Sequence, residues 1–357
     1  MEQNDRKICI YHFFFRTFAI AKVFAHYNTI MTRKLFSLFV AALCCASMWA
    51  TEGALSGRFT INADGDQVVF SQGNLQYQAS TQTWRFATNQ YNYVGDATNG
   101  NVYENDVKCN NVLIANDYSG WIDLFGWGTG DDPNKVNDNP INYGTFTDWG
   151  TNNIKNGGNE ANLWRSLTKD EWVYLFCGRT DASQLFGMGI VNGVKGIILL
   201  PDDWTGDKFT DTENGLEARP DSYYYNENGT NFSFHAYTIE LWESLMEPAG
   251  AVFLPATGGR IGIDVESDNS AGSIWSATPI RVGSAYRLFF DGFKLYPQDD
   301  TYRFPGFSVR LVQVIPANPT TIYNTDVNTK VAKRIENGQL LIEKKDKLYT
   351  ATGLEIK

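Results

Sequence analysis

The sequence predicts an α+β fold in which short strands outnumber helices, and three observations support this. Residues 59–87 alternate apolar and polar side chains around turn-forming segments, as paired strands do. Thr168 and Glu171 have the spacing of a capping box, which marks the start of a helix. The segments 272–278 and 306–311 alternate small, aromatic and apolar residues, which predicts a pair of strands that closes over a core.

Strands are expected along a single large domain, residues 51–315. The turn-rich segment 62–66 separates the first two strands, and residues 79–82 separate the next two. Residues 99–162 are dominated by Gly, Asn and Asp, and regularly placed aromatic residues are expected to hold these long irregular loops on the core. The expected strands are 59–61, 68–70, 75–78, 84–87, 196–201, 251–254, 273–276, 285–290 and 308–312.

Two short helices are expected within this domain. The first begins at the capping box and continues through Cys177, with its apolar side chains on one side. The second covers residues 238–246, with Leu241, Trp242 and Leu245 facing inward.

The amino terminus has the organisation of an export signal preceded by an extension. Arg33 and Lys34 form a basic segment, and an apolar run follows at 35–43. We therefore interpret residues 1–30 as a non-native upstream extension and residues 31–50 as a signal peptide. The apolar run is too short to span a membrane and no later segment resembles a span, so a secreted or outer-cell-surface location is expected.

The mature chain is expected to be strongly acidic. The whole sequence has a formal net charge of -10, and removal of residues 1–50 takes away six basic and two acidic residues, which gives -14. Nucleic acid and anionic membranes attract basic faces, so neither is an expected partner.

Few metal-ligating or nucleophilic side chains remain after that removal. Cys109 and Cys177 are then the only cysteines, and His235 is the only histidine. A zinc site needs three or four such ligands, and a Ser-His-Asp arrangement would have to use His235, which stands in an aromatic strand-like run that favours a structural imidazole. Export permits a disulfide between Cys109 and Cys177, and two free buried thiols are an equal alternative.

Four segments carry a resemblance to a known family: residues 164–172, 253–260, 275–278 and 306–310. As an ordered set they resemble the Fibrobacter succinogenes major paralogous domain, a family similar to C-type lectin-like domains and to the sulfatase-modifying, formylglycine-generating fold. The resemblance implies a C-type-lectin-like, sulfatase-modifying-factor-like core with long irregular loops. Residues 70–77 and 120–128 resemble the companion region of exported proteins of Bacteroidetes type.

The residues that carry activity in these similar proteins are not matched. Formylglycine-generating enzymes use a cysteine pair late in the fold, and no cysteine follows Cys177, so this activity is not expected and a non-enzyme is favoured. Calcium-dependent lectins use Glu-Pro-Asn or Gln-Pro-Asp together with Trp-Asn-Asp. The nearest match, Glu247 to Ala249, lacks the third ligand, so sugar binding through that calcium site is not expected.

Ligand-binding residues are expected on the loops around the closing strands, at 258–268, 279–284 and 293–303, because binding residues tend to lie on loops held by a rigid core. Trp275 and Arg310 lie in the strands and are expected to serve the fold. The loops carry charged and aromatic side chains suited to ligand contacts, namely Arg260, Asp264, Arg281, Lys294, Tyr296 and Tyr302.

One acidic loop is a weak candidate for a metal site. Asp131, Asp132 and Asp138 concentrate oxygen ligands, as calcium prefers, but their spacing matches no defined calcium motif. A solvated loop is therefore the favoured interpretation, and calcium is the one cofactor left open.

The composition changes beyond Val314. Residues 316–321 have the composition of an extended linker, and residues 322–357 predict a small β-meander separate from the core. This tail resembles the short carboxy-terminal sorting tails of exported Bacteroidetes proteins, which implies secretion machinery as a partner.

These expectations lead to an exported, non-catalytic binding protein with a glycan or protein ligand at the cell surface. Two alternatives stay open. One is a hydrolase that uses paired carboxylates, and the other is a structural subunit of a surface assembly.

Overall fold

The computed structural model divides the chain into two compact units, with the break between Ile315 and Pro316. The expected signal peptide and linker lie outside the described residues. The structure describes residues 52–94, 117–133, 145–210, 215–219, 221, 223–261 and 264–315, and the strands at 331–336, 339–344, 347–350 and 355–356.

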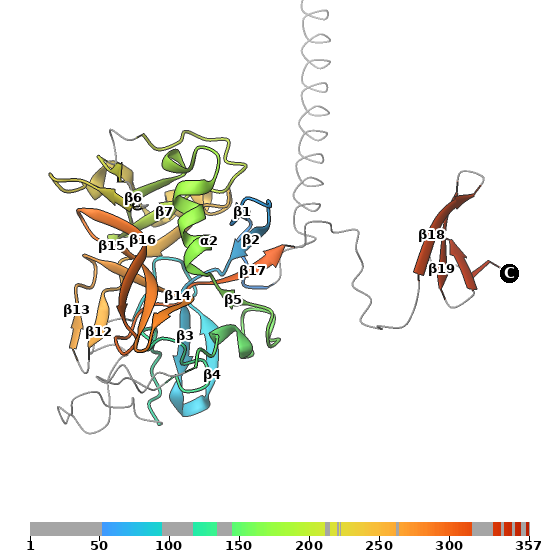
Figure 1. Ribbon diagram of the computed structural model, residues 1–357, viewed down its shortest axis with the longest axis horizontal. Coiled ribbons are helices and arrows are strands. Elements are labelled where there is room, and N and C mark those ends of the chain that lie inside the picture. Colours follow the sequence, from blue (N-terminus) through green and yellow to red (C-terminus); the bar gives the residue numbers. More distant parts are fainter. Residues whose placement is uncertain are drawn as a thin grey trace, which may run out of the picture. The chain divides into compact units, whose positions relative to one another are not determined.

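The first unit mixes many short strands with a few short helices, as the α+β prediction requires (Figure 1). Its strands are β1 (Phe59–Thr60), β2 (Gln67–Phe70), β3 (Leu75–Gln78), β4 (Thr83–Phe86), β5 (Arg165–Ser166), β6 (Phe186–Val191), β7 (Val194–Leu199), β8 (Glu217–Arg219), β9 (Tyr223–Tyr225), β10 (Ala236–Tyr237), β11 (Val252–Pro255), β12 (Gly259–Ile261), β13 (Asp264–Glu266), β14 (Gly272–Arg281), β15 (Ser284–Phe290), β16 (Lys294–Tyr302) and β17 (Leu311–Ile315).

The helices are single turns or little more. Among the described residues, two short α-helices each continue as a π-helix, and four 3-10 turns connect other elements. They are α2 (Lys169–Val173) with η5 (Tyr174–Gly178), α4 (Ile239–Leu241) with η8 (Trp242–Met246), and η1 (Ala79–Thr81), η4 (Trp149–Thr151), η6 (Ala182–Gln184) and η7 (Phe232–His235).

The strands form several sheets. Two are four-stranded, with the orders β1-β2-β17-β5 and β10-β6-β7-β11, and one is five-stranded, with the order β14-β15-β16-β9-β8. Two hairpins, β3-β4 and β12-β13, stand beside them, and α2 packs against β14, β15 and β16 (Figure 1).

Both expected amino-terminal hairpins are confirmed. In the first, β1 and β2 pair with Phe59 opposite Val68, and the Asn62 side chain accepts a hydrogen bond from the Asp66 N–H at 3.0 Å. Gly65 in this turn has a φ of 85°, a conformation that glycine adopts without steric cost. In the second hairpin, β3 pairs with β4 around η1.

The strand predicted at 308–312 is observed three residues later, as β17 at Leu311–Ile315. This strand pairs with β2 and β5, whereas its approach to β14 is a single parallel bridge between Ile274 and Ser308. The last strand of the unit therefore lies in the middle of a sheet that the first strands begin.

The predicted helix start at Thr168 is confirmed. Thr168 Oγ1 accepts the Glu171 N–H, and the Glu171 carboxylate accepts the Thr168 N–H at 2.7 Å. The second helix also begins where expected, after Thr238. Its inward face is only partly as predicted, because Trp242 is buried whereas Leu241 and Leu245 are 49% and 58% exposed.

The five-stranded sheet has one buried face and one outer face. Leu288, Phe290 and Leu295 belong to an apolar cluster with Trp172 of α2. Side chains alternate across a strand, so the residues between them point to the other face. That outer face carries the candidate site.

The second unit is an antiparallel sheet in the order β18-β19-β20-β21, as the predicted meander requires. Its strands are β18 (Val331–Glu336), β19 (Gln339–Lys344), β20 (Lys347–Thr350) and β21 (Glu355–Ile356). Among the described residues of the chain, no helix is both long enough and apolar enough to cross a membrane.

Candidate functional site

A cavity of about 610 Å³ opens on the outer face of the five-stranded sheet. Its size lies within the range of small-ligand sites in proteins. The β12-β13 hairpin, the start of β14, the middle of β15, the turn between β15 and β16 and the segment before β17 line it, and Lys195 of β7 and Phe232 of η7 complete it.

Arg287 is the central polar group of this cavity. Its guanidinium donates to Asp299 from Nε at 2.8 Å and to Ser273 Oγ from Nη1 at 2.9 Å. The same plane lies over the rings of Phe289 and Phe307, each centroid at 4.6 Å. Burial lowers the pKa of Arg287, and the nearby Asp299 opposes this. The two hydrogen bonds and the two ring contacts together hold the side chain in one orientation.

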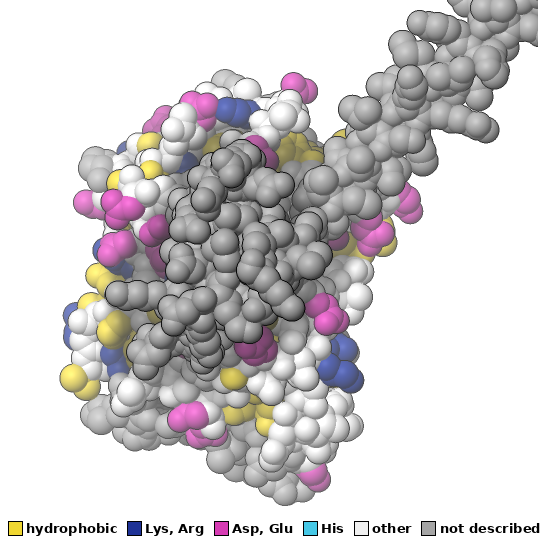
Figure 2. Space-filling model, turned by 90° about the vertical axis from the view of Figure 1, so that its right-hand side faces the viewer, with side chains coloured by type: hydrophobic (Ala, Val, Ile, Leu, Met, Phe, Trp, Pro, Cys, Tyr) yellow, Lys and Arg dark blue, Asp and Glu magenta, His cyan; other side chains and the backbone are white. Residues whose placement is uncertain are grey.

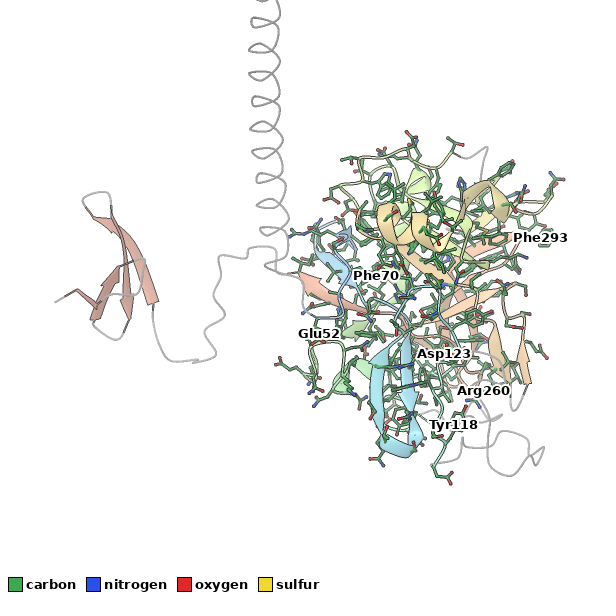
Figure 3. All side chains as sticks on the ribbon, turned by 180° about the vertical axis from the view of Figure 1, so that it is seen from behind. Glu52, Phe70, Tyr118, Asp123, Arg260 and Phe293 are labelled. Carbon is green, nitrogen blue, oxygen red and sulfur yellow. The ribbon has the colours of Figure 1, made fainter. Side chains whose placement is uncertain are left out.

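Aromatic rings form much of the remaining cavity wall. Phe289 and Phe307 form part of it, and Phe293 adds a ring that is 51% exposed at the rim. Figure 3 shows Phe293 at the edge of the unit. The turn that presents Phe293 is fixed by Asp291, whose carboxylate accepts the N–H groups of Phe293 at 2.7 Å and Lys294 at 3.0 Å.

An aromatic row leads from the cavity across the sheet. We use this name for Phe289, Tyr296, Tyr223 and Tyr225. Phe289 is the cross-strand partner of Tyr296, and the Tyr296 and Tyr223 rings stack with centroids 4.4 Å apart and an interplanar angle of 5°. The Lys294 ammonium lies 5.2 Å from the Phe289 centroid and 5.4 Å from that of Tyr296.

The structure brings two of the predicted binding residues together and separates two others. Lys294 and Tyr296 lie side by side at the start of β16, with the Lys294 ammonium 5.4 Å from the Tyr296 ring centroid. Arg281 and Tyr302 lie at the opposite end of the β14-β15-β16 ribbon, where Tyr302 is 57% exposed and stacks on Phe304. None of these four residues lines the cavity, and contact of any of them with a ligand stays a prediction.

The expected surface position of Arg260 is wrong. This side chain is fully buried, and its Nη2 donates to the Leu124 carbonyl at 3.4 Å. Figure 3 labels Arg260 and Asp123 in the same lower half of the first unit. Its strand pairs with the segment at Gly306, which turns the side chain inward. Asp264 is at the start of β13, with its backbone paired to Ile261.

The candidate metal loop is only partly described. Asp131 and Asp132 are exposed, and Asp138 lies outside the described residues. Within the described part of the chain, no group of three or more His, Cys, Asp or Glu side chains is arranged to hold a metal ion.

The remaining reactive side chains lie away from the cavity. His235 is buried against the ring of Phe209, at a centroid distance of 4.6 Å, which suits a structural imidazole. Cys177 is exposed and carries no disulfide, so the alternative of a buried thiol is wrong for this residue. Cys109 lies outside the described residues.

Sequence reasoning missed the residues at the centre of the site. Arg287 and Phe289 stand two residues apart in a correctly predicted strand, a spacing that places both on one face. The run from Tyr223 to Tyr225 likewise puts two tyrosines on one face. Both spacings are visible in the sequence, but which face of each strand points outward depends on pairing with distant strands.

No family model, curated protein or solved structure matches this chain. What the site can bind therefore follows from its own chemistry, because a fold alone does not define a function.

Proposed function

We propose that this chain is an exported, non-catalytic binding protein and that its ligand is a glycan. The cavity at Arg287 is the observation that carries the proposal. Sugar rings present C–H groups on their faces and hydroxyls at their edges. The cavity offers aromatic rings for the faces and fixed polar groups, at Arg287 and Ser273, for the edges.

Binding without catalysis is favoured because two carboxylates at the cavity are already held by hydrogen bonds within the protein. Asp291 is held by two backbone N–H groups, and Asp299 is held by Arg287. Glu266 is the other carboxylate that lines the cavity. A hydrolase that works through paired carboxylates needs two such groups aimed at one bond, and the hydrogen bonds of Asp291 and Asp299 serve the cavity wall.

A nucleic-acid ligand is not supported by the charge on the described surface. Figure 2 shows acidic side chains spread over one face of the first unit, with few basic ones between them. The basic residues at the cavity are accompanied by Asp299, Asp291 and Glu266. A phosphate backbone would need an uncompensated basic surface.

The proposal includes the finer fold and the location that the sequence predicts. A C-type-lectin-like, sulfatase-modifying-factor-like core would present its ligand on loops such as the turn between β15 and β16, which lines the cavity. The many short strands and few helices support this fold. The signal peptide and the tail are proposed to direct the protein to the outer cell surface.

A glycan and polysaccharide array probed with the full chain tests this function. We expect signals that Phe293→Ala lowers by about tenfold, the effect of losing about 1.4 kcal/mol of binding free energy. Phe234→Ala is the matched control, because this phenylalanine is 63% exposed and does not line the cavity. An array without specific signals, or equal binding by Phe293→Ala and the control, would overturn the proposal.

The same array run with and without calcium tests the metal question. We expect unchanged signals. Binding that appears only with calcium would point to a metal site, and loss of that binding in Asp131→Asn and Asp132→Asn would place it on the acidic loop.

A further inference from the structure

The aromatic row is a surface feature that the cavity alone does not require. Its members Tyr223, Tyr225 and Tyr296 lie on the face opposite Tyr224 and Leu295, which are both buried in the core. All three are half-buried, so part of each ring is open to solvent. Large half-exposed aromatic side chains in a row are uncommon unless they serve a contact.

The row is continuous with the cavity wall. Phe289 lines the cavity and pairs across the strands with Tyr296, which in turn stacks on Tyr223. The Arg287 guanidinium and the Lys294 ammonium lie 4.6 Å and 5.2 Å from the Phe289 centroid, so both cations contact the ring that joins the cavity to the row. From β15 through β16 to β9 this surface extends over about 10 Å, taking about 4.8 Å between neighbouring strands.

The row also has the chemistry of a sugar contact. Its parallel rings stand against one another, so they present ring edges and phenol hydroxyls outward. Tyrosine combines a rigid apolar body with a donor and acceptor at its tip, and it loses little conformational entropy on binding. The pKa of Tyr296 is raised, mainly by burial and to a smaller extent by the neighbouring Tyr223, so its hydroxyl keeps its proton at neutral pH.

Lys294 provides a charge beside this row. Its ammonium lies over two rings, and it forms no ion pair among the residues that the structure describes. Its donors are therefore available to hydroxyl or carboxylate oxygens of a ligand that passes between the cavity and Tyr223.

We propose that the ligand is an extended glycan chain, with one unit in the cavity and the following units along the aromatic row across β16 and β9. This inference rests on the proposed glycan-binding function. It adds that a single sugar fills only part of the site, so the affinity depends on chain length.

Titration calorimetry with the full chain tests this inference. The ligands are the glycan found on the array and its oligomers, from the monosaccharide to the hexasaccharide. We expect the affinity to rise at least tenfold over this series and then level off. Tyr223→Ala should lower the affinity for the hexasaccharide about tenfold and leave that for the monosaccharide unchanged, whereas Phe293→Ala should weaken both.

Two further variants separate the contact from effects on folding. Tyr223→Phe keeps the ring and removes only the hydroxyl, so it should lose less than Tyr223→Ala. Phe234→Ala, which removes an exposed aromatic ring outside both the cavity and the aromatic row, should bind the hexasaccharide as the wild type does. Far-UV circular dichroism confirms that each variant is folded.

The outcomes distinguish the two proposals. Affinity that does not depend on chain length, or a loss in Phe234→Ala equal to that in Tyr223→Ala, overturns the extended-chain inference and leaves the glycan-binding function in place. Absence of binding to any glycan removes the proposed function and this inference with it.

Discussion

Replacing Trp275 tests whether the strand behind the cavity is held as the structure indicates. This side chain is 1% exposed, and its indole N–H donates to the Phe125 carbonyl at 2.7 Å. Its ring lies 4.8 Å from that of Phe307, and its strand position is opposite Arg287. Trp275 therefore joins β14 to two segments that meet behind the cavity wall.

The expected cost follows from these contacts. Truncation of a buried aromatic residue typically costs about 3 to 5 kcal/mol, and we expect Trp275→Ala to lower the free energy of unfolding by this amount. The lost hydrogen bond accounts for about 1 kcal/mol, because the Phe125 carbonyl still accepts the Phe307 N–H at 2.9 Å and is not left without a donor. Trp275→Phe, which fills most of the space, should cost about 1 to 2 kcal/mol.

Urea unfolding followed by far-UV circular dichroism measures these differences. Trp204→Ala is the control, because this tryptophan is half-buried and its N–H donates to Asp207 within an exposed loop. Because Trp204 also packs on an apolar cluster, this change should cost about 1 to 2 kcal/mol, less than Trp275→Ala. A loss in Trp275→Ala no larger than that of the control would refute the assignment of Trp275 to the core.

Four further outcomes are expected. Thr168→Ala removes the capping box of α2 and should cost about 1 kcal/mol in the same unfolding assay, whereas an unchanged midpoint would contradict the role of this cap. A chain ending at Ile315 should melt within a few degrees of the full chain, and a large drop would mean that the second unit stabilises the first. Amino-terminal sequencing of exported material should find a start between Ser47 and Gly53, and retention of Arg33 and Lys34 would refute the signal peptide. Burial lowers the pKa of Arg310 to about 9, so above that pH the unfolded chain binds more protons than the folded one. The free energy of unfolding of the wild type should therefore rise relative to that of Arg310→Met by about 1 kcal/mol per pH unit between pH 9 and 10.5, and absence of this rise would show that Arg310 is not buried as a cation.

The sequence predicted best those elements whose signals are local. The hairpin at Asn62 to Asp66 depends on turn residues that are adjacent in the chain, and the cap at Thr168 depends on Glu171 three residues later. The helix after Thr238 was also placed correctly. The inward position of Leu245 was not, because the chain changes to π-helical hydrogen bonding at Trp242, which shifts later side chains around the axis. Leu241 precedes this change, and the π-helix does not account for its exposure.

Strand β16 could not be predicted because distant partners define it. Pro297, Asp299 and Asp300 are unfavourable in the middle of a sheet, yet β16 lies between β15 and β9. The register shift between Arg287 and Phe289 accommodates an irregular stretch, and Arg287 neutralises the Asp299 carboxylate. The cavity was missed for the same reason, since Lys195, Ser273 and Phe307 meet only after the sheets have formed.

The position of β17 between β2 and β5 has a consequence for how the chain can fold as it is made. The middle of this sheet stays open until residues 311–315 are available, although its first strands are complete by Phe70. A growing chain therefore leaves the edge of β2 unpaired until β17 is made, and the edge of β5 as well once residue 166 is present, and such edges readily associate with other chains. This sheet is therefore completed only when almost all of the first unit has been synthesised.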